Sequence, residues 1–128
     1  MIEAELTGSR FVLAVQELGR SADFYRTQLG FRTLWEGEGW HFLQRGAVCV
    51  MLGECPDDLP AFELGCHSYF AYLDVTGIDA LFEELSQKEV EMLSQPEDKP
   101  WGQREFAIRT IDGHRLTFGE RTSGSSPQ

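Results

Sequence analysis

The fold is decided by residues 11–31, which read FVLAVQELGRSADFYRTQLGF. Apolar residues alternate at the start of this stretch, and a period of two predicts a half-buried β-strand. The spacing then becomes helical, with apolar residues at Leu18, Ala22, Tyr25 and Leu29. Gly30 is the expected C-terminal cap, because glycine adopts the left-handed backbone that ends many helices. The chain therefore opens with a strand followed directly by a helix.

Three short strands are expected next, at residues 31–36, 40–45 and 47–52. Glycine-containing turns separate them, at residues 37–39 and 45–46, as in a meander of antiparallel strands. Residues 55–66 then interrupt the pattern with Pro and Asp, which predicts a linker.

The same order of elements returns after the linker. A strand is expected at residues 69–75, and further strands at 90–93, 105–110 and 115–118. The helix between them carries the apolar stripe Ile78, Leu81, Phe82 and Leu85. Thr76 and Asp79 have the spacing of a capping box at the start of that helix.

The two halves match each other position by position. At an offset of 60 residues, the apolar residues Val15, Leu18, Ala22 and Tyr25 match Val75, Ile78, Phe82 and Leu85. Residues 50–54 (VMLGE) match residues 116–120 (LTFGE) at an offset of 66. A duplicated strand-helix-strand-strand-strand unit explains both matches.

The expected class is therefore α+β, with two tandem βαβββ modules. The modules cover about residues 9–54 and 67–120, with the linker at 55–66, inside a single domain over residues 1–120. Residues 121–128 are rich in Ser, Gly and Pro and are expected to be a disordered tail.

Composition limits the partners. Asp and Glu outnumber Lys and Arg by 21 to 11 in 128 residues, which gives a formal charge of −10. Nucleic acid and anionic membrane surfaces are disfavoured, because both would repel this charge. No apolar run is long enough to span a membrane, and the acidic N-terminus lacks the basic start of a signal peptide. We therefore expect a cytoplasmic protein.

Three motifs carry a family resemblance. They are LxVxxLxxSxxFYxxxLGF at residues 13–31, GxREF at 102–106 and DGHxLxFGE at 112–120. With the internal repeat, they make the chain similar to the vicinal oxygen chelate superfamily, which includes glyoxalase I, extradiol dioxygenases and bleomycin resistance proteins. The resemblance implies that each module curls a mixed sheet around a cavity. It also implies a homodimer, often with modules exchanged across the interface.

Metal-dependent members of that superfamily carry their ligands on the first and last strands of each module. The resemblance places these positions at Arg10, Met51, Phe70 and Thr117. None of them offers the imidazole or carboxylate that a divalent ion needs. We therefore expect no metal and no cofactor. A relocated site from His41, Cys49 and Glu105 is an alternative, but no spacing motif supports it.

Ligand contacts are expected at the residues of the cavity and its rim: Arg10, Trp35, His41, Met51, Phe70, Trp101, Glu105 and Thr117. A tryptophan at the rim, Trp101 above all, can stack on a flat ligand. Each tryptophan can equally fill the core or a subunit interface. Arg10 needs a carboxylate partner if it points inward, and that partner is either Glu105 or a group on the ligand.

The leading hypothesis is a metal-free small-molecule binding protein of the bleomycin resistance kind. It would sequester an aromatic or drug-like compound in the clefts of a homodimer. The alternative is a glyoxalase-like lyase, isomerase or dioxygenase, either with a relocated metal site or with Glu105 or His41 as a general base. No catalytic residue is assigned, because the usual metal positions do not hold metal ligands.

Overall fold

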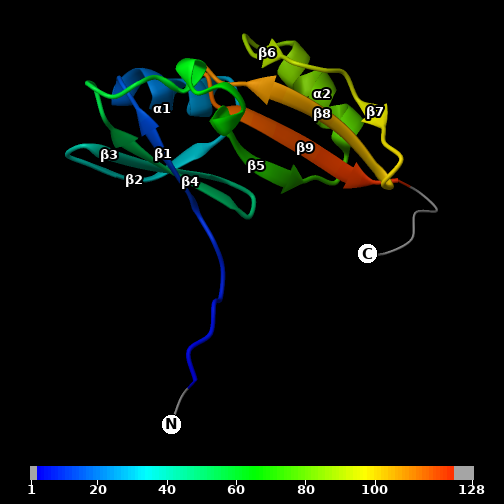
Figure 1. The fold of residues 1–128 in the computed structure, drawn as a ribbon, viewed down its shortest axis with the longest axis horizontal. Coiled ribbons are helices and arrows are strands. Elements are labelled where there is room, and N and C mark those ends of the chain that lie inside the picture. Colours follow the sequence, from blue (N-terminus) through cyan, green and yellow to red (C-terminus); the bar gives the residue numbers. More distant parts are fainter. Residues whose placement is uncertain (1–2, 123–128) are drawn as a thin grey trace.

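The computed structural model describes residues 3–122 and shows two modules lying side by side (Figure 1). The first contains β1 (Phe11–Val15), α1 (Leu18–Thr27), β2 (Arg32–Gly37), β3 (Trp40–Arg45) and β4 (Val48–Glu54). Its sheet has the order β1-β4-β3-β2, with β1 parallel to β4.

The second module repeats this plan with one addition. It contains β5 (Tyr69–Asp74), α2 (Ile78–Ser86), β6 (Glu91–Met92), β7 (Glu97–Asp98), β8 (Gln103–Arg109) and β9 (Arg115–Arg121). Its sheet has the order β5-β9-β8-β6, and β7 also pairs with β8. The α+β class with two βαβββ modules is confirmed, and neither sheet closes into a barrel.

The structure departs from the expected elements in the segments with the weakest apolar pattern. Two 3-10 turns, Ala61–Glu63 and Gly65–Ser68, lie in the second half of the linker and the two residues after it. Strand β7 lies where a loop was expected; it places Asp98 opposite Arg104, and the two form an ion pair of 3.0 Å. Strand β9 extends to Arg121, and residues 123–128 of the expected tail lie outside the described residues.

In each module, backbone N–H groups at the start of the helix donate hydrogen bonds to a glutamate near the end of the last strand. Glu54 Oε2 accepts a hydrogen bond of 3.3 Å from the backbone N–H of Leu18. In the second module, Glu120 accepts two, from the N–H groups of Gly77 at 3.1 Å and Ile78 at 2.9 Å. These N–H groups have no partner within the helix, so a carboxylate here satisfies donors and the helix dipole together.

The expected capping box at Thr76 and Asp79 is wrong. The N-cap of α2 is Gly77, and no side chain of its own segment caps the helix. Gly77 has a left-handed backbone with φ of 88°, which favours glycine. The cap comes instead from Glu120, 42 residues away from Ile78, and local spacing cannot reveal so distant a partner. Gly30 is not the C-cap of α1, because the helix ends at Thr27 and its C-cap is Gln28. Gly30 follows two residues later with a left-handed backbone, at φ of 74°.

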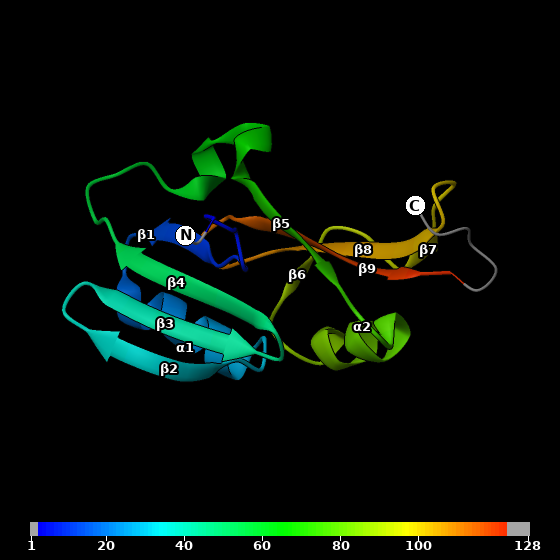
Figure 2. The same ribbon diagram turned by 90° about the horizontal axis from the view of Figure 1, so that it is seen from below.

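One face of each sheet is buried against a helix, and the other is open. Alternate residues of the sheets point toward the helices, and a continuous core joins both modules through Leu13, Leu43, Leu52, Leu73, Phe106, Ile108 and Phe118. Figure 2 shows α1 behind the first sheet, with no helix over the face toward the viewer. Within residues 3–122, no helix is long and apolar enough to cross a bilayer.

Replacing Glu120 with alanine should lower the free energy of unfolding, and the loss should shrink in acid. Bonds to the two N–H groups hold the pKa of the Glu120 carboxyl below its ordinary value. A lowered folded-state pKa means that the carboxylate stabilises the fold above its unfolded-state pKa and loses this contribution as pH falls through the folded-state value. Urea unfolding at about pH 7 and about pH 3 measures the difference. Glu38→Ala, in an exposed turn, is the control; an equal loss at both pH values would contradict the prediction.

Candidate ligand-binding site

A three-residue cluster lies on the open face of the second sheet. Trp101 Nε1 donates a hydrogen bond of 2.7 Å to Glu105 Oε2, and Tyr72 Oη donates one of 2.9 Å to the same oxygen. Trp101 remains 59% exposed and Tyr72 43% exposed. Burial and the bond to Glu105 raise the pKa of Tyr72 above its ordinary value, so its hydroxyl stays protonated and donates. The cluster fixes two aromatic rings around one carboxylate.

The absence of a side chain at Gly119 allows this cluster to form. Tyr72 lies on β5 and Glu105 on β8, and β9 runs between these two strands. Gly119 is the residue of β9 directly opposite Glu105. A Cβ atom at Gly119 would overlap the Tyr72 hydroxyl. The tyrosine therefore reaches across β9 only because this position is glycine.

The first sheet has a similar aromatic group on its open face. The Trp35 ring lies 5.1 Å from that of Phe42, and the Trp40 ring lies 6.1 Å from it on the other side. Trp40 covers Gly53, where a Cβ would come within 2.9 Å of the indole. Both tryptophans are exposed. Both sheets thus carry solvent-exposed aromatic rings on their open faces.

Gly53 and Gly119 occupy matching positions of the two modules. They lie 66 residues apart, at the offset of the repeated VMLGE and LTFGE segments. In each module an aromatic side chain from a neighbouring strand lies over this glycine, Trp40 in one and Tyr72 in the other. The paired glycines were the sequence signal for Tyr72, which was not among the expected ligand contacts.

The expected site residues divide according to the face on which they lie. Trp101 and Glu105 touch each other. Thr117 pairs with Tyr72 in the second sheet, so it lies beside the cluster. Met51 pairs with Phe42, and Trp35 packs on the same phenyl ring, so both belong to the open face of the first sheet.

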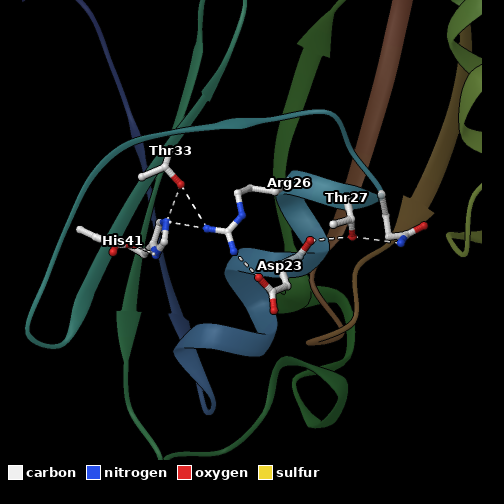
Figure 3. Close-up of polar contacts among 7 residues, drawn as sticks. Asp23, Arg26, Thr27, Thr33 and His41 are labelled. Atoms are coloured by element: carbon white, nitrogen blue, oxygen red, sulfur yellow. Dashed lines mark hydrogen bonds and ion pairs between the residues drawn. The ribbon is translucent and has the colours of Figure 1, made fainter.

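His41 lies on the opposite face of the first sheet, under α1 (Figure 3). Only 6% of it is exposed. Its Nε2 is 2.8 Å from Thr33 Oγ1 and 3.4 Å from Arg26 Nη1, and its Nδ1 is 3.5 Å from Glu36 Oε2. Burial is the main cause that lowers the pKa of His41, and Arg26 adds to it. This histidine joins helix to sheet and does not face the Glu105 cluster.

Phe70 and Arg10 also lie apart from the cluster. The Phe70 ring packs edge-on against Phe11 at 5.8 Å and against His114 at 5.9 Å. Arg10 precedes β1 and is exposed, and it forms no ion pair with a carboxylate of residues 3–122. Glu105 is bonded to Trp101 and Tyr72 instead, so the expected alternative of an Arg10–Glu105 pair is absent from the described structure.

The side chains at the usual metal positions do not fit a divalent ion. Guanidinium, thioether, phenyl and hydroxyl groups stand at Arg10, Met51, Phe70 and Thr117, and none is an imidazole or a carboxylate. In the described part of the chain, no three His, Cys, Asp or Glu side chains come together as a metal-binding group. His41 and Glu105 lie on different faces of different sheets, so the relocated site does not assemble.

The family follows from the sequence profile that the chain matches. Residues 9–118 match the Glyoxalase/Bleomycin resistance protein/Dioxygenase superfamily. The chain belongs to this superfamily. Among functionally curated proteins, none matches the chain closely enough to count as a relative. The matched range covers both modules, so the resemblance found in the three motifs extends over the whole folded part.

Solved structures share the fold at low sequence identity. A bleomycin resistance determinant encoded on transposon Tn5 has a TM-score of 0.76 at 21% identity, covering 92% of this chain and 100% of that one. A bleomycin-binding protein from Streptomyces verticillus, complexed with copper(II)-bleomycin, has a TM-score of 0.73 at 20% identity, covering 98% and 100%. A glyoxalase/bleomycin resistance protein/dioxygenase from Nocardioides has 0.75 at 19%, covering 99% and 91%.

Glu105→Gln should bring the pKa of Tyr72 down toward its ordinary value. The neutral amide removes the negative charge and the charged acceptor that now hold the phenolic proton. The measurement is a pH titration of the tyrosine Cζ resonances by NMR. Glu91→Gln, on β6, is the control, because Glu91 pairs with Arg109 and is not among the groups that shift the pKa of Tyr72. An unchanged Tyr72 titration in Glu105→Gln would show that the hydrogen bond is not formed.

Proposed function

We propose that this chain is a metal-free cytoplasmic binding protein that sequesters an aromatic or drug-like compound. The compound lies in a cleft of a homodimer, and capture is stoichiometric. One observation carries the proposal: exposed rings lie on the open faces of both sheets, and one of them, Trp101, is fixed by a hydrogen bond of 2.7 Å to Glu105. An aromatic ring held in place loses little conformational entropy when a ligand stacks on it.

The Glu105 cluster supplies the polar part of recognition. Both of its internal bonds end on Oε2, so Oε1 is left to accept a hydrogen bond from a ligand amine, amide or hydroxyl. A ligand that combines a flat ring with such a donor satisfies Trp101 and Glu105 together. Bleomycin is bound by a structural neighbour of this chain, and this supports a compound of that size and polarity as the first probe.

The homodimer is supported by the amount of apolar surface on the open faces. Val12 is 62% exposed on β1, and Trp35, Trp40 and Tyr72 are exposed on the same faces. A contiguous apolar face of this kind is typical of an interface or a ligand site. In a two-fold dimer the first sheet of one subunit can face the second sheet of its partner, which creates two equal clefts.

Binding is tested by titrating the purified protein with bleomycin in isothermal calorimetry, with and without EDTA. We expect one ligand per subunit and the same affinity in both buffers. Trp101→Ala should weaken binding by about tenfold or more, because a stacked tryptophan is a typical hot spot. Phe62→Ala removes an exposed ring from the linker and is the matched control. Metal-dependent turnover of a substrate, with about one bound metal per subunit, would overturn the proposal in favour of an enzyme.

The dimer is tested separately by sedimentation velocity. Val12→Glu places a charge in the apolar face, so we expect the wild-type dimer to become a monomer. Leu59→Glu is the matched control, because Leu59 is also 62% exposed but lies in the linker. A wild-type monomer at concentrations well above the bleomycin Kd, or a Val12→Glu dimer, would contradict the proposed cleft.

A further inference from the structure

A cavity of about 430 Å³ lies between the two modules. Leu29, Phe31 and Val48 of the first module form one wall, and Leu81 and Leu85 of α2 form the other. Its floor is Leu73 and Phe118, which point away from the face that carries Tyr72 and Glu105. The cavity is therefore separate from the proposed aromatic site, on the α2 side of the second sheet. Its volume falls in the range of small-molecule pockets.

Arg45 is the cationic group of this cavity and is firmly held. Its Nη1 donates to the Leu29 carbonyl at 2.9 Å and to Glu84 Oε2 at 2.8 Å, while Nη2 donates to Glu84 Oε1 at 2.9 Å. Gly30 makes room for it, because a Cβ there would lie 3.0 Å from Arg45 Nη1. The pair joins β3 of the first module to α2 of the second, and both residues line the cavity. The Arg45 bond lowers the pKa of Glu84, which keeps that carboxyl ionised.

Two donors of Arg45 are left over. A guanidinium has five N–H groups, and three of them are used by Leu29 and Glu84 among the described residues. The remaining two, on Nε and on Nη2, lie along the same edge of the planar group. Two parallel N–H groups of this kind match the two oxygens of a carboxylate. The edge away from Glu84 is thus a second fork for an anion.

A guanidinium in this chain already binds two carboxylates at once. Arg104 donates through Nε to Asp79 and through Nη1 to Asp98, each at 3.0 Å. The protein therefore holds one arginine with two acids at a comparable, partly exposed place. Glu84 does not have to leave Arg45 before a second carboxylate binds.

We propose that this inter-module cavity binds a medium-chain monocarboxylate. The carboxylate pairs with the free edge of Arg45, and the alkyl chain lies among Leu81, Leu85 and Phe118. Apolar walls favour the chain by removing it from water. Arg45 is the one cation of the lining, and Asp74 and Glu84 are its acids, so a single carboxylate is the head group that Arg45 can accommodate. Because the occupant touches both modules, its binding stabilises their arrangement and raises the unfolding temperature.

The probe is octanoate, and octanol is the matched compound without the charge. The protein is titrated with each in two-dimensional amide NMR. We expect saturable shifts at Gly46, Ala47 and Leu81 with octanoate, and binding of octanol weaker by about tenfold or more. Arg45→Gln should abolish the preference for octanoate. Arg32→Gln, an exposed arginine on β2, should leave it intact.

A second variant keeps Arg45 and removes the space. Ala80 lines the cavity from an exposed position on α2, so Ala80→Trp should fold and should block both compounds. Absence of saturable binding, equal affinity for octanoate in Arg45→Gln, or octanoate binding to Ala80→Trp would each overturn the inference. Octanoate shifts centred on Tyr72 and lost in Trp101→Ala would overturn it too, by placing the acid on the open face. Failure of bleomycin binding does not affect this result, so the two proposals fail separately.

Discussion

The parallel pairing of the first and last strand of each module is the constraint from which the rest of the structure follows. Strand β1 lies parallel to β4, and β5 lies parallel to β9. A parallel pair needs a crossover connection, and the helix of that connection covers one face of its sheet. Glu54 is the last residue of β4, and Glu120 is the last but one of β9. Each carboxylate accepts hydrogen bonds from the start of its module's helix. Pairing, helix position and capping therefore depend on one another in both modules.

One consequence is that each sheet has one face that no helix covers. A helix on one side leaves the other without cover, and here that side carries Trp35, Trp40, Tyr72 and Trp101. The glycines at matched positions of β4 and β9 let rings cross the strands and lie flat. The Glu105 carboxylate then fixes two of these rings through a single oxygen. Two of these rings, Tyr72 and Trp101, are therefore held by hydrogen bonds, and a side chain that is already held in place loses less entropy in a binding event.

The second consequence concerns the space between the modules on the helix side. The modules share a core, yet α2 and the β3–β4 turn border a half-open cavity. Arg45 and Glu84, which line this cavity, connect the modules through a bidentate ion pair. Because this pair is partly exposed, its stabilising effect is modest. Its main effect is on position, because the pair holds the Arg45 guanidinium beside the apolar walls of the cavity, on the side of the sheet opposite the aromatic rings.

The α+β class, the duplicated module and most helices and strands follow from local sequence. Alternating and helical spacings of apolar residues are local properties, and the internal repeat shows each of them in both halves of the chain. The sequence also placed both Trp101 and Glu105 among eight expected ligand contacts, without indicating that these two side chains touch. Two features depend on residues distant in sequence and were decided by the tertiary structure: the cap of α2 by Glu120 and the contact of Tyr72 with Glu105 across Gly119. Strand β7 has only two residues, which is too short to show an alternating pattern. The tertiary structure also decided that His41 lies on the face of its sheet that α1 covers. Alternate residues of a middle strand point to opposite faces, and the position of the helix decides which of these faces is buried.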